Sequence, residues 1–227
     1  MKVEESIWIS KKILKFSKPK QKLLNIGSST KEFRNKIQAH ISRNIFVPIG
    51  KYGIKVTHTD IQDAEGVDLV GNLLDEEFIK ILEKEKFDFI LCSNLLEHLD
   101  DINPICNIIE RILKKNGYAI ITVPYNYPYH LDPIDNMFRP TVKELSKKFK
   151  NLEIIDGEIL NASSYNTKLG KLEKNYFQKL INNPKMLALI FLRSLVPFYK
   201  YSVWKKTMFG VKRLFKPFSV TCIILKN

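Results

Sequence analysis

The sequence predicts an α/β fold with a mainly parallel sheet and helices on both faces of that sheet. Two observations support this prediction. Along residues 21–160, short apolar segments alternate with segments that carry the start signals of helices. The length of 227 residues and the hydrophobic content of 44% suit one full-sized globular domain, which excludes disordered and collagen-like classes.

The first half of this region contains three predicted strands and two predicted helix starts. The strands are expected at 22–27, 53–61 and 66–74, where apolar residues run together or alternate with polar ones. Ser29 and Glu32 fit a capping box, so a helix is expected after the first strand. Asp75 is followed by two glutamates, which stabilise a helix N-terminus and therefore predict the next helix there.

The second half continues the alternation with three more strands. Phe87 to Ser93 is the most hydrophobic of them and is expected to be buried on both faces. Asn103 and Pro104 predict the start of a helix that runs to about residue 115. Thr141 and Glu144 form a second capping box, for a helix through about residue 149. The other two strands are expected at 117–124 and 152–160.

The segments outside this core differ from it in charge. Residues 1–20 form a short N-terminal segment that is amphipathic over residues 6–16. Residues 161–227 hold 13 Lys or Arg and one acid, Glu173, whereas residues 1–160 are close to neutral. We expect this basic extension to be helical and to close with a strand at 219–225, at the edge of the sheet. Such charge asymmetry favours contact with an anionic surface, polymer or substrate.

The basic extension also contains an apolar run, at 185–201. Arg193 and Pro197 interrupt this run, which is shorter than the roughly 20 residues that span a bilayer. Packing against the sheet and contact with an anionic membrane surface through 185–216 both stay open. The N-terminus does not have the pattern of a signal peptide, and three widely spaced cysteines predict no disulfide framework. The sequence therefore predicts a cytoplasmic protein, with a peripheral place on the inner face of the membrane as the further expectation.

Ligands of open α/β sheets bind beyond the carboxyl ends of the strands, so the residues that end each strand are the candidates for a binding site. A dinucleotide fingerprint would need glycines where Ser29 and Glu32 stand, so NAD is disfavoured. Asp60 ends the second predicted strand, where its carboxylate is placed to accept hydrogen bonds from a ribose. A nucleoside ligand without a pyrophosphate fits this pattern better.

Several stretches together resemble one family. They are LLNIGSS at 23–29, THTD at 57–60, VGNLLD at 70–75, FDFILCSNLLEHLDD at 87–101, ILKKNGYAIITVP at 112–124 and YPYHLDPIDNMFRPTVKEL at 127–145. The set resembles class I S-adenosylmethionine-dependent methyltransferases over roughly residues 20–160, and it implies their Rossmann-like fold and their cofactor. The chain departs from the family pattern at Asn25, where an acid is usual, and at Ser29, where a glycine is usual.

The resemblance implies a role for each matching residue. Gly27 and Ser28 would meet the methionine part of S-adenosylmethionine, and Asp60 would hold the ribose. Asn72 and Leu73 would lie at the adenine, and Ser93 and Asn94 near the sulfonium. His98, in the turn just beyond, is expected to be a packed and hydrogen-bonded histidine rather than a catalyst.

Methyl transfer requires an oriented acceptor and removal of one proton, and His130 is the predicted proton acceptor. Asp132 is predicted to act with it in catalysis, and substrate contacts are expected at Tyr129, Asp135 and Arg139. The alternative is a polar turn locked by the prolines at 128 and 133, in which Arg139 pairs with an aspartate. The H-x-D-x-x-D spacing is not that of a metal site, so no metal is predicted.

The sequence also makes some classes of methyl acceptor less expected. Ser93-Asn94-Leu95-Leu96 replaces the Asp/Asn/Ser-Pro-Pro-aromatic motif of base-flipping amino methyltransferases, and no Pro-Cys pair offers a nucleophile for cytosine C5 chemistry. Nucleic acid is therefore the less expected partner. The prediction is O-methylation of a small metabolite, a sugar or a lipid-linked glycan. RNA methylation and a noncatalytic membrane-peripheral role on a decayed methyltransferase fold are the alternatives.

Overall fold

The computed structural model describes residues 1–130, 134–162 and 218–227. The chain divides into two compact units, one of residues 1–160 with 219–227 and the other of residues 161–218. The first unit contains the sheet. The predicted helical extension and its membrane-contacting stretch, 185–216, lie outside the described residues, as does Asp132.

A sheet of seven strands organises the first unit, in the order β3-β2-β1-β4-β5-β7-β6. The neighbouring pairs from β3 to β5 are parallel, and β7 runs antiparallel to β5. The predicted α/β class with a mainly parallel sheet is thus confirmed. The strands are β1 (Lys22–Ile26), β2 (Lys55–Asp60), β3 (Leu69–Val70), β4 (Phe87–Ser93), β5 (Leu113–Asn126), β6 (Glu153–Ala162) and β7 (Phe218–Lys226).

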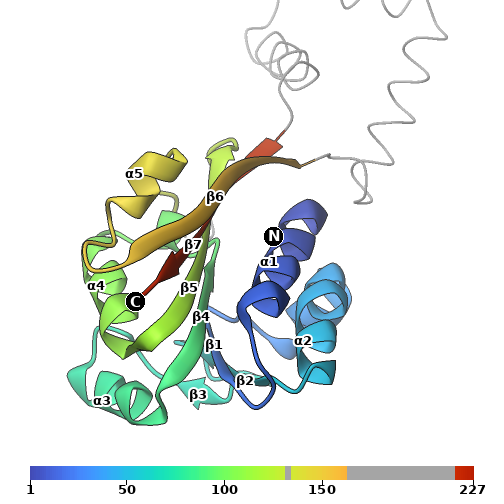
Figure 1. Cartoon of the computed structure of the whole chain (residues 1–227). Helices are drawn as coiled ribbons and strands as arrows, with labels where there is room; N and C mark the ends of the chain where they lie inside the picture. Colours follow the sequence, from blue (N-terminus) through green and yellow to red (C-terminus); the bar gives the residue numbers. More distant parts are fainter. Residues whose placement is uncertain (131–133, 163–217) are drawn as a thin grey trace, which may run out of the picture. The chain divides into compact units, whose positions relative to one another are not determined.

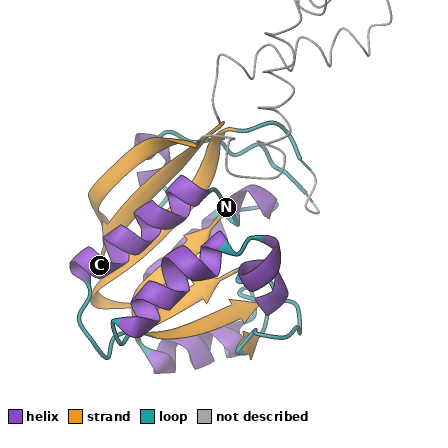
Figure 2. Cartoon of the chain, turned by 90° about the vertical axis from the view of Figure 1, so that its right-hand side faces the viewer, coloured by secondary structure: helices purple, strands orange, loops and turns teal. Residues whose placement is uncertain are grey.

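Helices cover both faces of the sheet (Figure 1). On one face α3, α4 and α5 pack with β4 and β5 around a core that includes Leu82, Ile109 and Leu145. On the other face α1, η2 and α2 enclose a second core, and Figure 2, turned toward this side, shows helices in front of the sheet. The helices are α1 (Val3–Phe16), η1 (Phe33–Ile37), η2 (Ser42–Phe46), α2 (Val47–Lys51), α3 (Glu76–Glu85), η3 (Leu96–His98), α4 (Asn103–Ile112) and α5 (Val142–Ser146).

The N-terminal helix α1 is part of this unit rather than a separate segment. Its apolar stripe buries Trp8, Ile9 and Ile13 in the second core, as expected for an amphipathic helix that packs on a sheet. The first residues of α1 thereby reach the edge of the sheet where the parallel strands end, and the N-terminus is marked there in Figure 1. Among the described residues, no helix has both the length and the apolar character needed to cross a membrane.

The structure corrects three predictions about individual elements. Strand β7 lies between β5 and β6 instead of at the edge, because its side chains are buried on both faces over almost its whole length. Ser29 does not cap the helix after β1; Thr30 does, since its hydroxyl accepts the Phe33 N–H at 3.0 Å. The helix predicted to reach residue 115 ends at Ile112, where β5 begins.

Candidate functional site

The carboxyl ends of β1 and β2 form a joined turn around Asp60. Gly27 and Ser29 have positive φ angles of 64° and 55°, which turn the chain sharply after β1. The Asp60 carboxylate accepts the N–H of Ser29 at 2.7 Å and that of Gln62 at 3.2 Å. Each carboxylate oxygen keeps a lone pair, so Asp60 is held in place yet retains the capacity to accept hydroxyl groups.

Arg34 stabilises this turn through hydrogen bonds to its backbone, a role that the sequence patterns did not predict. Its guanidinium donates to the carbonyl oxygens of Ser28 at 2.8 Å, Ser29 at 2.5 Å and Gly66 at 2.6 Å. Burial lowers the pKa of Arg34, and the carboxylates of Asp68 and Asp60 oppose that shift. The loops after β1 and β2 are therefore tied together by one buried cation.

The residues predicted to meet adenine follow β3. The Asn72 side chain is exposed, and its Oδ1 accepts the Leu74 N–H at 2.9 Å, a bond that does not use the amide N–H groups. Leu73 is half-buried against the core. The Gly71 N–H donates to the Asp60 carbonyl oxygen at 3.0 Å, so the adenine and ribose candidates lie on directly bonded segments.

Replacing Gly71 with alanine is expected to lower the free energy of unfolding by about 1–3 kcal/mol. A Cβ built at Gly71 would collide with the ring of Phe78, a residue of α3 that is buried in the core. Gly50→Ala is the matched control, because nothing lies within 4 Å of a Cβ at that helical position. Urea denaturation of both variants measures the difference. An unchanged midpoint for Gly71→Ala would contradict the close approach.

At the carboxyl ends of β4 and β5, the side chain of Glu5 from the N-terminal helix forms hydrogen bonds with residues that are far from it in the sequence. Glu5, in the first turn of α1, is 1% exposed. Its Oε1 accepts the Thr122 hydroxyl at 2.6 Å, the Asn94 amide at 2.7 Å and the Ser93 hydroxyl at 3.5 Å. Its Oε2 accepts the Lys2 N–H at 2.8 Å. The two residues predicted to lie near the sulfonium are thus in direct contact with a buried acid.

A second buried acid follows in the turn η3. Glu97 is 1% exposed, and its Oε2 has no hydrogen-bond partner among the described residues. Burial raises the pKa of Glu97 to about 8, and the negative charge of Glu5 adds to the shift. Its Oε1 lies 3.8 Å from Nε2 of His98.

His98 and His130 meet at the rim of this edge. Nδ1 of His98 lies 2.6 Å from the Ile134 carbonyl oxygen, so the expectation of a hydrogen-bonded His98 agrees with the structure. The His130 ring packs edge-on against those of His98 and Tyr127, with centroids 5.1 Å apart in both pairs. Asn136 fixes the two loops together, because its side chain donates to the Leu96 carbonyl oxygen at 2.8 Å.

Asp135 and Arg139 form a closed pair beneath His130. The Asp135 carboxylate has no exposed surface, and it accepts Nη2 of Arg139 at 2.6 Å and the N–H of His130 at 3.0 Å. Burial alone would raise the pKa of Asp135, but Arg139 and the backbone donors outweigh it and lower the pKa to about 2. These contacts favour the polar-turn alternative for this pair over direct substrate contact. Tyr129, in contrast, is 59% exposed.

The residues present fit S-adenosylmethionine. The turn at Gly27 leaves little space for a side chain at this position, since a Cβ there would lie 3.0 Å from Leu95. Beyond it lie an oriented carboxylate for a ribose at Asp60, an exposed amide at Asn72, and a buried carboxyl oxygen at Glu97 to which no described residue donates. Within the described residues, no three His, Cys, Asp or Glu side chains gather into a group that could hold a metal ion.

Comparison with known proteins identifies relatives for this arrangement. A family model described as a methyltransferase domain matches residues 8–154. No curated protein matches the chain. Several hundred solved chains resemble it in structure, and three illustrate the likeness.

The first is a proposed sarcosine dimethylglycine methyltransferase from Galdieria sulphuraria, 14% identical, with a TM-score of 0.57 over 99% of this chain and 84% of that one. The second is SpnF, a 4+2 cyclase, 10% identical, with a TM-score of 0.55 over 99% and 80%. The third is coclaurine N-methyltransferase bound to N-methylheliamine and SAH, 12% identical, with a TM-score of 0.54 over 99% and 70%. At these identities the likeness shows the fold alone.

Proposed function

The chain belongs to the methyltransferase domain family and is an S-adenosylmethionine-dependent methyltransferase, and from that premise we propose that it methylates a hydroxyl group of a small molecule. A small metabolite, a sugar or a lipid-linked glycan is the proposed acceptor. The observation that supports a hydroxyl acceptor is the pair of packed imidazoles, His98 and His130, at the rim of the site. A hydroxyl must lose a proton during methyl transfer, and imidazole is suited to accept one near neutral pH.

The residues at the carboxyl ends of the strands would each contact a different part of the cofactor. The turn at Gly27 and Ser28 would meet its amino acid part, Asp60 its ribose, and Asn72 with Leu73 its adenine. Ser93 and Asn94, fixed by Glu5, would border the reacting end. When bound, S-adenosylmethionine supplies an activated methyl group, so the chain's own task is to orient the acceptor and accept its proton.

On the acceptor side, exposed Tyr129 offers a surface for substrate, and His130 remains the proposed proton acceptor. Residues 161–227 carry a large excess of Lys and Arg over acidic residues. This charge supports the proposal that the segment meets an anionic head group or membrane surface and that the protein works at the cytoplasmic face.

An amine acceptor is a second candidate, because the two buried carboxyls of Glu5 and Glu97 would stabilise an ammonium group.

Calorimetric titration with S-adenosylhomocysteine tests the premise, and an acceptor screen with isotope-labelled cofactor tests the acceptor. A labelled product whose new methyl group is bonded to oxygen supports the proposal, whereas one with the methyl on nitrogen supports the amine alternative. Transfer to RNA, with binding that weakens steeply as salt rises, would overturn the small-molecule proposal. Failure to bind at millimolar concentration would favour the noncatalytic alternative.

Changing Asp60 to asparagine is expected to weaken cofactor binding by about 10- to 100-fold, because hydrogen bonds to a charged acceptor contribute about 1.5–3 kcal/mol. Asp63→Asn is the matched control, since Asp63 is an exposed acid three residues further along the same loop. The dissociation constants of S-adenosylhomocysteine for the two variants give the measurement. Equal affinity of Asp60→Asn and the wild-type chain would remove Asp60 from the site.

A further inference from the structure

Glu97 is a buried acid that the described residues do not neutralise. Its side chain is 1% exposed, it stands in the turn directly after β4, and its Oε2 has no hydrogen-bond partner there. A buried carboxylate without a counter-charge costs several kcal/mol, so such a group keeps its proton instead. The raised pKa of Glu97, to about 8, follows from this burial.

The charged and titratable groups around Glu97 do not supply the missing cation. Arg139 and the N-terminal ammonium group attract its charge, but Arg139 is bonded to Asp135 and the ammonium group to Gln38. The other ionisable neighbours are Glu5 on α1, His98 in the same turn and Cys92 at the end of β4. Glu5 repels a second negative charge, and His98 uses Nδ1 on a carbonyl oxygen.

The two buried acids differ in how they are satisfied. The two carboxyl oxygens of Glu5 receive four donors, from Lys2, Ser93, Asn94 and Thr122. Oε2 of Glu97 receives no hydrogen-bond donor from the described residues. A positive charge arriving at the carboxyl end of β4 would therefore act on Glu97, because Glu97 is the one of the two that has a buried oxygen without a donor among the described residues.

We propose that Glu97 is the counter-charge of the cofactor's sulfonium and releases its proton when S-adenosylmethionine binds. The inference rests on the proposed function, that is, on cofactor binding at the ends of β1, β2 and β4. In this step the O–H bond of the Glu97 carboxyl breaks, the electron pair stays on the carboxylate and the proton passes to the buffer. No other bond changes, and the charge at the site is conserved because a cation replaces a proton.

This assignment gives Glu97 a second role once methyl transfer has removed the positive charge. The carboxylate then lacks its counter-charge and takes up a proton from the solvent, which restores the neutral acid, while the proton of a hydroxyl acceptor still passes to His130. S-adenosylhomocysteine, a neutral thioether, gains nothing from an ionised Glu97. Glu97 thus makes the site prefer the charged cofactor over the spent product near pH 8 and favours product release.

Calorimetry of the full chain tests the proposal without any acceptor. Titrations with S-adenosylmethionine and S-adenosylhomocysteine at pH 7, each in phosphate and in Tris, give the number of protons released from the dependence of the heat on the buffer. We expect about one proton for the sulfonium and none for the thioether, because the two ligands share the same amino acid and nucleoside. The affinity for S-adenosylmethionine alone should rise by about tenfold per pH unit between pH 6 and 8.

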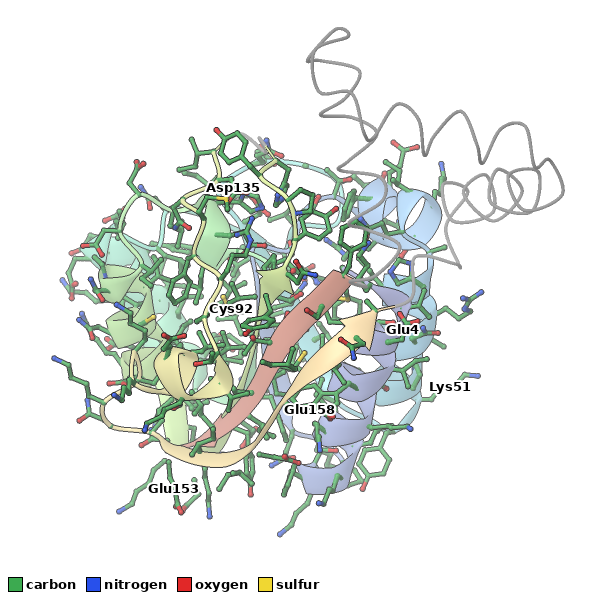
Figure 3. All side chains as sticks on the ribbon, turned by 90° about the horizontal axis from the view of Figure 1, so that it is seen from above. Glu4, Lys51, Cys92, Asp135, Glu153 and Glu158 are labelled. Carbon is green, nitrogen blue, oxygen red and sulfur yellow. The ribbon has the colours of Figure 1, made fainter. Side chains whose placement is uncertain are left out.

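Glu97→Gln should abolish both the proton release and the pH dependence. The same substitution should also weaken the binding of S-adenosylmethionine by about tenfold and change the affinity for S-adenosylhomocysteine by less than about twofold. Glu153→Gln is the control, because Glu153 is an exposed acid at the start of β6, which Figure 3 shows well apart from Asp135. Equal proton release with both ligands in the wild-type chain overturns the proposal, even if no variant folds. Failure to bind either ligand overturns the proposed function and this inference with it.

Discussion

Replacing Asp135 with asparagine is expected to lower the free energy of unfolding by about 3–5 kcal/mol. The change leaves the guanidinium of Arg139 buried beside a neutral group, although the wild-type pair is 2.6 Å apart. The same carboxylate accepts the N–H groups of His130 and Met137, and the single acceptor oxygen of an amide cannot keep both of these bonds and the bond to Arg139 in place. Urea denaturation at pH 7 measures this loss.

Glu77→Gln is the control for a pair with similar geometry and different burial. Glu77 and Lys80 are 2.7 Å apart on the exposed face of α3, so their loss is expected to cost less than about 1 kcal/mol. If the two variants were destabilised equally, burial of the Asp135–Arg139 pair would not be what stabilises the loop.

The pH dependence of the wild-type chain offers an independent check on Asp135. Its folded pKa of about 2 lies below the ordinary value of 3.8, so the unfolded chain binds the proton first as pH falls. The stabilisation is therefore complete above about pH 4 and is lost as pH falls through 2, by about 2 kcal/mol in total. The Asp135→Asn variant should lack this component of acid unfolding.

The sequence allowed the sheet to be predicted, and with it the shared edge at which the proposed cofactor residues lie, because both depend on local patterns. Apolar runs that end at Gly27, Asp60 and Ser93 do lie at neighbouring carboxyl ends. The position of β7 could also have been predicted by the rule that was applied to Phe87–Ser93. The run at 219–225 is equally apolar, and that pattern is typical of a strand buried on both faces rather than of an edge strand.

The two buried acids, Glu5 and Glu97, could not be predicted in the same way. The contact between Glu5 and Thr122 joins residues 117 positions apart, and no spacing pattern connects them. Glu5 occurs in the sequence as an ordinary acid in the first turn of a helix, and Glu97 as part of a polar stretch before the next helix. Their importance comes from burial, which depends on how α1 packs over the ends of β4 and β5.

Glu97 is expected to make the chain without cofactor less stable as pH rises from 6.5 to 8, by about 2 kcal/mol. The folded state keeps the Glu97 proton up to about pH 8, whereas the unfolded chain releases it near 4.5, so the folded state binds the extra proton in this interval. Stability is therefore favoured at low pH and lost as pH rises toward 8. Below pH 6.5 a second group opposes this trend.

That opposing group is His58. Burial lowers its pKa to about 4 from an ordinary 6.5, so the unfolded chain binds the proton first between these values and stability rises with pH there. The slopes of Glu97 and His58 cancel below pH 6.5, which leaves the interval above it as the informative one. Urea midpoints at pH 6.5, 7.2 and 8 should fall for the wild-type chain and for Glu153→Gln, and stay level for Glu97→Gln. Falling midpoints in Glu97→Gln would place the titrating group elsewhere in the chain.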